Sequence, residues 1–398
     1  MKTLSKRYQR FHFPWHEGNR FEILIDGSNF FTHMLNAIDS ARQNILLEMY
    51  LVESGNVVDR FITAIQNAAE RGTQVHILFD DYGAIGLKQS DQERLTHKNI
   101  QLVYYNKLLS HNTMYNLYRI FLRHQEYVLH RNHRKLLLVD GKTAFVGGTG
   151  LTDEFDPSEH PEKSWRETMV KIQGPVVGDW QQLFVESWNK SSQQPLNLPP
   201  VKPDELSTTQ PGLQPGRVAI NNIQRYSELL LSLTSQINHA NHRIWLSSAY
   251  FLPGWRIRRT LKRAANSGVD VRLLLPGPIT DHPAVRYAGH RFYGRLLKND
   301  IRIFEYQPRF LHSKCVLCDD WVTIGSSNFD RWNLRWNLEA NQEIKDESLA
   351  TQVKEMFEQD FSNSVEYTYK EWHQRSWRLR LVQWFWKQVE RFSLKIGR

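Results

Sequence analysis

The sequence predicts an α/β protein made of two related halves, each a mixed β-sheet flanked by helices. Three observations indicate this fold. Strand-like and helix-like segments alternate along the chain, the same order of segments occurs twice, and a stretch rich in Pro, Ser, Gln and Gly separates the copies. A chain of 398 residues also exceeds what one hydrophobic core usually covers, which favours two domains.

The repeated unit begins with a strand and an amphipathic helix. NILLEMYLVESG (44–55) matches RIWLSSAYFLPG (243–254), and the helical pattern that follows ends in each copy at a glycine, Gly72 or Gly268, which suits a helix C-cap. TQVHILFDD and VDVRLLLPG come next as apolar runs typical of buried parallel strands. NIQLVYYN and NDIRIFEYQ complete the match, ahead of a second pair of β-rich stretches.

These patterns divide the chain into five segments. We expect an N-terminal extension (1–14), a first domain (15–189), a linker (190–216), a second domain (217–365) and a basic, Trp-rich C-terminal helix (366–398). The linker prediction rests on composition alone.

The charge balance predicts an anionic partner. Lys and Arg number 51 against 42 Asp and Glu, a formal net charge of +9. Such a surface favours nucleic acid or an anionic membrane leaflet, and charge alone does not choose between them.

Two further patterns bear on the compartment. The only cysteines, Cys315 and Cys318, provide no disulfide framework and favour a reducing compartment; within a strand they would face opposite sides and be ordinary strand residues. The N-terminus lacks the apolar core of a signal peptide, and no charge-free apolar run reaches about 18 residues. We therefore expect any work on membranes to be done from their surface.

The strongest signal lies in HRNHRKLLLVDGKTAFVGG (130–148) and its copy 179 residues later. The residues repeated in register are His133, Lys135 and Asp140, and His312, Lys314 and Asp319. On a strand, a His and a Lys two positions apart share a face, so two halves facing each other would form a pocket with two imidazoles and two ammonium groups. One neutral imidazole could attack a phosphodiester while the other protonates the leaving alkoxide and the lysines offset charge, with no metal or cofactor required.

These motifs resemble those of the phospholipase D superfamily, whose signature is H-x-K-x4-D followed by a Gly-rich GG/GS-x-N segment. The second copy matches it at Gly325, Ser326 and Asn328. The first copy has Gly147 and Gly148 but continues with Thr149 and Gly150, so the two halves of the pocket should be unequal, and a hydroxyl of Thr149 or Thr152 is a candidate replacement for the missing Asn. The expected substrate-binding residues are Gly148, Thr149, Ser326 and Asn328.

The resemblance also implies an acidic residue downstream of each motif that orients a histidine. Glu167 and Glu339 fit those places, and the sequence leaves open which carboxylate serves which histidine. The family pattern favours His133 as nucleophile and His312 as general acid and then base, although the residue types permit the reverse. Asp140 and Asp319 belong to the catalytic signature but are expected to fix local geometry.

Within the superfamily, the chain resembles bacterial cardiolipin synthases of the short form without N-terminal transmembrane helices. FEYQPRFLHSK and WNLEANQEI carry this resemblance, which covers nearly the whole chain. It implies two phospholipase D-like domains that make cardiolipin from phosphatidylglycerol and a second phospholipid, possibly phosphatidylethanolamine, through a phosphohistidine. The enzyme would sit peripherally on the cytoplasmic face of the cell membrane, with no nucleic-acid partner and with its oligomeric state open. A phospholipase D-type hydrolase, a nuclease of the same superfamily and a non-catalytic lipid-binding protein are the alternatives.

Two segments are candidates for membrane contact. The C-terminal segment (366–398) mixes tryptophans with many Lys and Arg, which suits an anionic bilayer surface but also permits packing on the protein. Residues 104–130 form an insertion without a counterpart in the second half, which could admit lipid tails or be a core helix.

Overall fold

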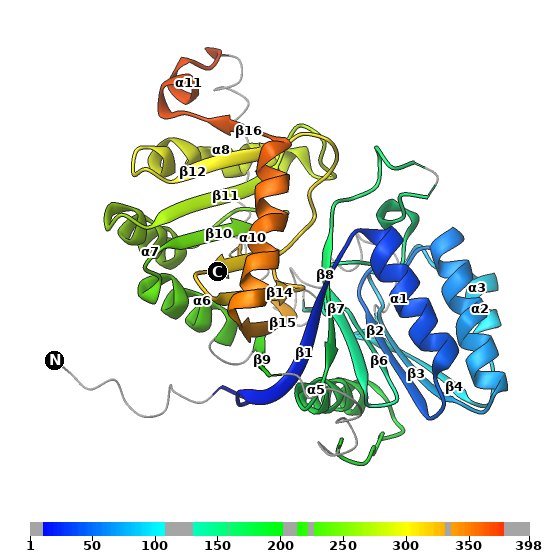
Figure 1. The fold of residues 1–398 in the computed structure, drawn as a ribbon. Helices are drawn as coiled ribbons and strands as arrows, with labels where there is room; N and C mark the ends of the chain where they lie inside the picture. The colour runs from blue at the N-terminus through cyan, green and yellow to red at the C-terminus, as the bar shows by residue number, and fades with distance from the viewer. Residues whose placement is uncertain are drawn as a thin grey trace, which may run out of the picture.

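The computed structural model describes residues 11–107, 130–158, 160–201, 213–221, 227–330 and 336–377. Its strands join in one sixteen-stranded sheet that contains both halves (Figure 1). The first half contributes β1 (His16–Ile25), β2 (Asn44–Met49), β3 (Gln74–Asp80), β4 (Ile100–Tyr105), β5 (Arg131–Asn132), β6 (Leu136–Val139), β7 (Thr143–Gly147) and β8 (Thr168–Gln173). The second contributes β9 (Gln214–Asn221), β10 (Arg243–Ser247), β11 (Asp270–Pro276), β12 (Arg302–Tyr306), β13 (Cys315–Cys318), β14 (Trp321–Gly325), β15 (Asn337–Lys345) and β16 (Ser364–Tyr367).

The strand order confirms the duplicated mixed sheet. Outward from the central pair β1–β9, the first half runs β8-β7-β6-β2-β3-β4 and the second runs β15-β14-β13-β10-β11-β12, with β16 added at the edge. In each half the last three shared strands are parallel and the others antiparallel. The two halves are therefore related by a pseudo-twofold between β1 and β9.

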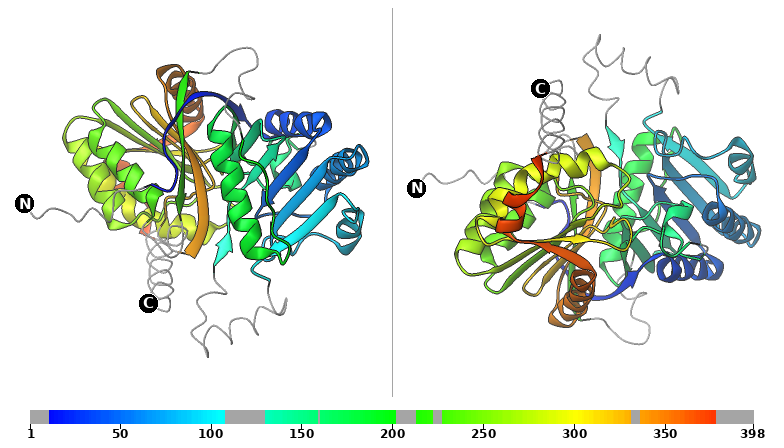
Figure 2. Two further views of the ribbon diagram at one scale, coloured as in Figure 1. Left: turned by 90° about the horizontal axis from the view of Figure 1, so that it is seen from below. Right: turned by 90° about the horizontal axis from the view of Figure 1, so that it is seen from above.

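Helices lie on the outer flanks and at the junction of the halves (Figures 1 and 2). They are α1 (Gly27–Ser40), α2 (Asn56–Glu70), α3 (Gln89–Arg94), α5 (Val176–Ser191), α6 (Glu228–His239), α7 (Trp255–Asn266), α8 (Pro283–Leu297), α10 (Glu347–Ser362) and α11 (Tyr369–Gln374), with a 3-10 turn, η3, at Asp153–Phe155. One core packs α1 and α2 against the first sheet, another packs α6, α7 and α8 against the second, and a central core joins both sheets through α5 and α10.

The period of two along the strands builds these layers. On β2, Leu46 enters the central core while Ile45 and Leu47 enter the outer one. The same alternation separates the two cysteines, because Cys315 lies in the central core and Cys318 in the outer core of the second half. Both are free thiols in a strand, as expected, and burial raises their pKa values.

The predicted glycine caps end α2 and α7. Gly72 and Gly268 have φ angles of 97° and 90°, a conformation that costs glycine little. In α2, Gly72 N donates to Ala69 O and Thr73 N donates to Ala68 O, the hydrogen-bond pattern of a Schellman motif. The repeat thus extends to the way its helices terminate.

Parts of the predicted segmentation can be set beside the structure. β9 begins at Gln214, inside the stretch 190–216 predicted as linker, because Gln214 and Gly216 pair with β1. In the C-terminal segment, β16 ends at Tyr367 and α11 at Gln374, while 378–398 lie outside the described residues, as do 108–129 of the insertion. Within the described ranges, no helix is both long and apolar enough to span a bilayer.

Charged side chains fasten the halves together through the central core. Arg166 Nε and Nη2 donate to the two carboxylate oxygens of Asp360 on α10, at 3.2 and 2.9 Å. Arg309 also pairs with Asp26 across the same junction. The Arg166 and Asp360 side chains are only 3% and 7% exposed, so each charge depends on the other for compensation.

We predict that Asp360→Ala lowers the free energy of unfolding by about 3 kcal/mol or more, because it leaves the Arg166 guanidinium buried without its carboxylate. Glu366→Ala is the control, since Glu366 forms a similar bidentate ion pair with Arg302, but the two side chains are 38% and 42% exposed. Its loss should stay below about 1 kcal/mol. Urea unfolding measures both, and equal losses would contradict a special role for the buried pair.

Candidate active site

Each half anchors the histidine motif of the other half through the backbone. β5 pairs in parallel with β15, Asn132 opposite Leu338, and His133 N donates to Leu338 O at 3.0 Å. The reciprocal crossing joins Arg166 to Leu311, and His312 N donates to Arg166 O at 2.8 Å. His133 therefore lies beside Leu338, which precedes Glu339 in the chain. His312 lies in the same way beside Arg166, which precedes Glu167.

This crossing corrects one expectation. His133 and Lys135 were expected on one face of a strand, but they lie in the extended segment between β5 and β6, and their counterparts lie just ahead of β13. The physical reason is that the backbone N–H of each histidine bonds to a residue of the opposite half instead of to a neighbouring strand of its own half.

The glutamates are exchanged between the halves in the same way. His133 Nδ1 lies 3.1 Å from Glu339 Oε2, and His312 Nδ1 lies 2.6 Å from Glu167 Oε2. Both carboxylates are fully buried. Because a carboxylate accepts, Nδ1 is the donor in each pair, and the lone pair of a neutral ring lies on Nε2, which in His312 is 3.1 Å from Lys314 Nζ. The question that the sequence left open is answered: each carboxylate serves the histidine of the other half.

The two lysines reach back toward their own histidines. Lys135 Nζ donates to His133 O at 2.6 Å, and Lys314 Nζ donates to His312 O at 2.5 Å and lies 3.5 Å from Glu167 Oε2. Burial lowers the pKa of Lys135 to about 7 and also lowers that of Lys314, against the opposing influence of the two glutamates. Two buried carboxylates thus compensate two buried ammonium groups.

Burial also lowers the pKa of both histidines. Lys135 adds to this effect at His133, and Lys314 adds to it at His312, whose pKa falls well below its ordinary value. Lys135 and His133 of the other half contribute to the lowered pKa of His312, so both motifs share one electrostatic environment. The neutral imidazole is accordingly the favoured form of each ring.

The glycine-rich segments differ between the halves. A Cβ on Gly148 would lie 2.3 Å from Glu167 Oε2 and 2.9 Å from Lys314 Nζ, so no side chain fits there. At the equivalent place, Ser326 Oγ donates to Glu339 Oε2 at 2.5 Å. Ser326 was expected to bind substrate, but in the structure its hydroxyl holds the carboxylate that orients His133.

The Asn that only the second copy has is buried with an unsatisfied amide in the described part of the chain. Asn328 is 1% exposed, and both polar atoms of its side chain lack a hydrogen-bond partner in the described part of the chain. Since an unpaired buried amide is costly, this side chain is suited to a phosphate oxygen. In the first copy, a Cβ on Gly150 would lie 2.8 Å from Leu51 O, which excludes an Asn without a shift of the backbone.

The two threonines considered as replacements differ. Thr149 Oγ1 donates to Gly150 O at 3.0 Å, whereas the buried Thr152 Oγ1 has no partner within the described residues. Thr152 is thus the hydroxyl that remains available.

The signature aspartates lie at the far ends of the following strands. Asp140 and Asp319 have φ angles of 54° and 52° in the turns after β6 and β13. Their carboxylates accept backbone N–H groups ahead of β2 and β10, from Arg42, Gln43 and Asn44 and from Asn241, His242 and Arg243, at 2.7–3.0 Å. They fasten the turns after β6 and β13 to the starts of β2 and β10, at the ends of β6 and β13 remote from the histidines.

Sequence reasoning missed the aromatic surroundings. Tyr50 lies 4.7 Å from His133 between ring centroids, and Tyr250, whose hydroxyl donates to Asp281, lies 6.4 Å from His312. Three more rings lie 5.1–5.6 Å from the His312 ring: Trp165, Phe155 and Phe310. The tyrosines could have been found, because both follow the repeated strands at 44–49 and 243–247.

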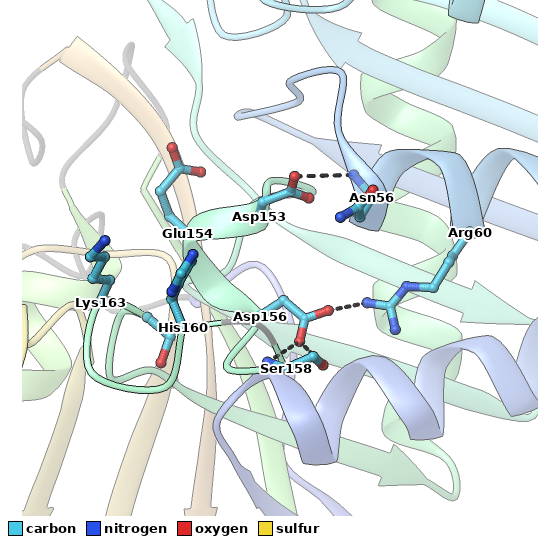
Figure 3. Close-up of a pocket in the computed structure, with 9 residues that line it drawn as sticks. Asn56, Arg60, Asp153, Glu154, Asp156, Ser158, His160 and Lys163 are labelled. Carbon is cyan, nitrogen blue, oxygen red and sulfur yellow. Dashed lines mark hydrogen bonds and ion pairs between the residues drawn. The ribbon is translucent and has the colours of Figure 1, made fainter.

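A cavity of about 340 Å³ opens between the start of α2 and residues 153–164 (Figure 3). Arg60 pairs with Asp156 across it, and Asp153 accepts the backbone N–H of Asn56. Neither His133 nor His312 lines this cavity, and its charges are partly satisfied by one another. It does not offer the paired imidazoles found at the crossing.

The chain is similar to known phospholipid-synthesising proteins in sequence and in fold. The family model described as "Cardiolipin synthase, PLD-like domain" matches residues 34–188 and 233–361. Cardiolipin synthase A of Pseudomonas aeruginosa is 32% identical over 358 residues, covering 89% of this chain and 69% of that protein, and its Pseudomonas putida counterpart is 32% identical over 359 residues, covering 89% and 71%. The crystal structure of phosphatidylserine synthase from Haemophilus influenzae Rd KW20 shares the fold, with a TM-score of 0.71 at 14% identity over 96% of both chains.

For the aspartates, we predict that Asp140→Ala lowers the free energy of unfolding by about 2 kcal/mol, because three backbone donors lose their acceptor. Asp140→Asn should lose less, since Asn tolerates positive φ and keeps one carbonyl acceptor. The folded variants should keep their turnover within about threefold. A large fall in turnover at unchanged stability would instead assign Asp140 to the chemistry.

Proposed function

Because this chain belongs to the phospholipase D-like cardiolipin synthase family and is thus a phosphatidyltransferase of that superfamily, we propose that it makes cardiolipin from phosphatidylglycerol and a second phospholipid. The observation that carries the proposal is the pair of crossed His–Glu contacts, with two buried lysines, around one site. Neutral imidazoles beside compensated ammonium groups suit an anionic phosphodiester that must be attacked and released.

In the first step, His133 Nε2 attacks phosphorus of the donor lipid. The Nδ1–H group of this ring donates a hydrogen bond to Glu339, which leaves the Nε2 lone pair for the new P–N bond. The P–O bond to the headgroup breaks, and His312 Nε2–H gives its proton to the leaving alkoxide. Lys135, Lys314 and Asn328 would hold the non-bridging oxygens, where negative charge accumulates.

In the second step, the reaction runs in reverse with a new alcohol. His312, now neutral, takes the proton of the headgroup hydroxyl of phosphatidylglycerol, the alkoxide attacks phosphorus, and the P–N bond to His133 breaks. Cardiolipin leaves, and both histidines return to their starting states.

Transfer requires that water lose to the lipid alcohol at the second step. The rings of Trp165, Phe155 and Phe310 pack around His312, the group that would deprotonate the acceptor. Apolar surfaces there restrict the room for competing water, which supports transfer over simple hydrolysis.

The order of the two histidines follows the family pattern. The stronger lowering of the pKa of His312 would, by itself, favour that ring as the neutral nucleophile. A bound phosphodiester adds negative charge between the rings and raises both pKa values, which supplies the protonated ring that the leaving group needs. The assignment is decided by locating the covalent bond.

The substrates place this enzyme at a membrane. We propose that it works peripherally, from the cytoplasmic face, on phosphatidylglycerol in an anionic leaflet, to which a net charge of +9 is attracted.

We predict that His133→Ala and His312→Ala each lower cardiolipin formation at least about 100-fold, while His160→Ala, at an exposed position, leaves it unchanged. Incubation with phosphatidylglycerol labelled in the phosphate should leave acid-labile label on His312→Ala and none on His133→Ala. If only His133→Ala carried label, the roles of the two histidines would be exchanged. If cardiolipin formed but no phosphate label could be trapped on any of the proteins, the covalent route would be excluded. Phosphatidic acid as the sole product would make the enzyme a hydrolase.

We also predict a fall in kcat/KM as pH rises through about 7, because Lys135, with its pKa near that value, loses the proton that attracts phosphate. On the acid side, kcat/KM should fall only below the ordinary histidine range, since the pKa of His133 is lowered. Lys135→Arg, whose charge does not titrate, should remove the basic limb even if its maximum is lower. A basic limb retained in Lys135→Arg would assign it to another group.

A further inference from the structure

Two neighbouring helices on the outer flank of the second half carry an unusual excess of positive charge (Figure 1). The sequence of α7, WRIRRTLKRAAN, has five Arg or Lys and no Asp or Glu, and α8 adds three Arg, again without an acidic residue. Both helices turn their apolar side chains, such as Ile257, Leu261 and Phe292, into the same core. Most of their cations are thereby left toward solvent, with Arg256, Arg259, Lys262, Arg263 and Arg295 exposed, whereas Arg286 turns inward to pair with the buried Glu305.

A groove of about 520 Å³ lies between these helices. Its lining is dominated by cations from both walls and the turn after α8, namely Arg258, Arg259, Lys262, Arg295 and Lys298. Arg258 lies 4.8 Å and Arg291 4.4 Å from the centre of the Phe292 ring, which holds both guanidiniums in place. A fixed cluster of like charges around a hollow is complementary to phosphate groups.

Exposed tryptophans accompany the cations. Trp255, at the first residue of α7, lines the groove and is 58% exposed. α11 packs on α8 through Trp372, which lies 3.4 Å from the position a Cβ would take on Gly294, and the next tryptophan, Trp377, is 66% exposed. Tryptophan beside Lys and Arg is typical of surfaces that meet lipid headgroups.

The groove is connected to the candidate active site through α7. Tyr250, whose ring faces His312, comes five residues before Trp255, and the segment between them leads directly into the helix. Contact of the Trp255 end with a bilayer would therefore hold the lipid surface beside the site that consumes its molecules.

We propose that the α7–α8 groove is a docking surface for anionic phospholipid headgroups and holds the enzyme on the bilayer independently of its catalytic pocket. The choice of lipid over nucleic acid rests on the proposed function. The residues that line the groove all come from α7, α8 and the turn after α8, and the described start of the C-terminal segment, with α11 and Trp377, lies beside them.

The test uses the full chain and vesicles of equal parts phosphatidylglycerol and phosphatidylcholine. The groove variant is Arg259→Glu/Lys262→Glu/Lys298→Glu, three exposed positions. The matched control, Lys88→Glu/Lys98→Glu/Lys142→Glu, makes the same change in net charge at exposed positions of the first half. In co-sedimentation at low salt, the groove variant should bind about 100-fold more weakly than the unchanged protein, because each of its three lost cationic contacts should weaken binding roughly fivefold. The control should change binding less than about fivefold.

A second arm separates docking from catalysis. Phosphatidylglycerol with short acyl chains, kept below its critical micelle concentration, needs no docking, so the groove variant should keep the kcat/KM of the unchanged protein. Loss of this activity would place the groove in the chemistry and overturn the proposal. Equal losses of vesicle binding in the groove variant and the control variant would overturn it too. So would a groove variant that no longer binds duplex DNA but still binds vesicles like the unchanged protein. A protein that binds vesicles through the groove but forms no cardiolipin would refute the proposed function and leave the docking surface standing.

Discussion

The crossed His–Glu pairing is the interaction on which the site depends. A His or a Lys buried on its own would be too costly to keep charged, and each half alone supplies a histidine and a lysine while the carboxylate that serves them comes from its partner half. The backbone bonds of His133 to Leu338 and of His312 to Arg166 impose this exchange. Catalytic chemistry and the packing of the two halves are therefore one structural property, and the Arg166–Asp360 pair in the central core supports both.

Duplication produces a symmetric frame, and a few residues then make its two sides unequal. Glu339 accepts from Ser326 Oγ, whereas Glu167, opposite Gly148, accepts from the backbone N–H of Thr168 at 2.8 Å. Asn328 offers an unpaired amide on one side, and Gly150 offers none on the other. A reaction that needs one nucleophile and one proton donor requires such a difference, because two identical histidines would compete for each role.

The sequence was sufficient for the repeat, since its strands, helices and Gly caps follow local patterns that each half states independently. It was also sufficient to name the histidines and lysines, because their spacing occurs twice. It could not reveal the exchange of Glu167 and Glu339, which depends on parallel bridges between segments more than 140 positions apart. The contact of Ser326 with Glu339 was missed for a similar reason: Glu339 lies on the neighbouring strand and not beside Ser326 in the chain.

Positive charge serves two different purposes in this molecule. In the pocket, Glu167 and Glu339 compensate the lysines, so the site can release an anionic product as well as bind an anionic substrate. Such compensation limits the attraction that the pocket exerts on lipid at a distance. Helix α7 has five cations and no carboxylate of its own, so its own side chains do not limit its attraction for anions in this way. In the proposed enzyme, this separation of attraction from chemistry would let the α7–α8 groove hold the membrane while the pocket exchanges one phospholipid for the next.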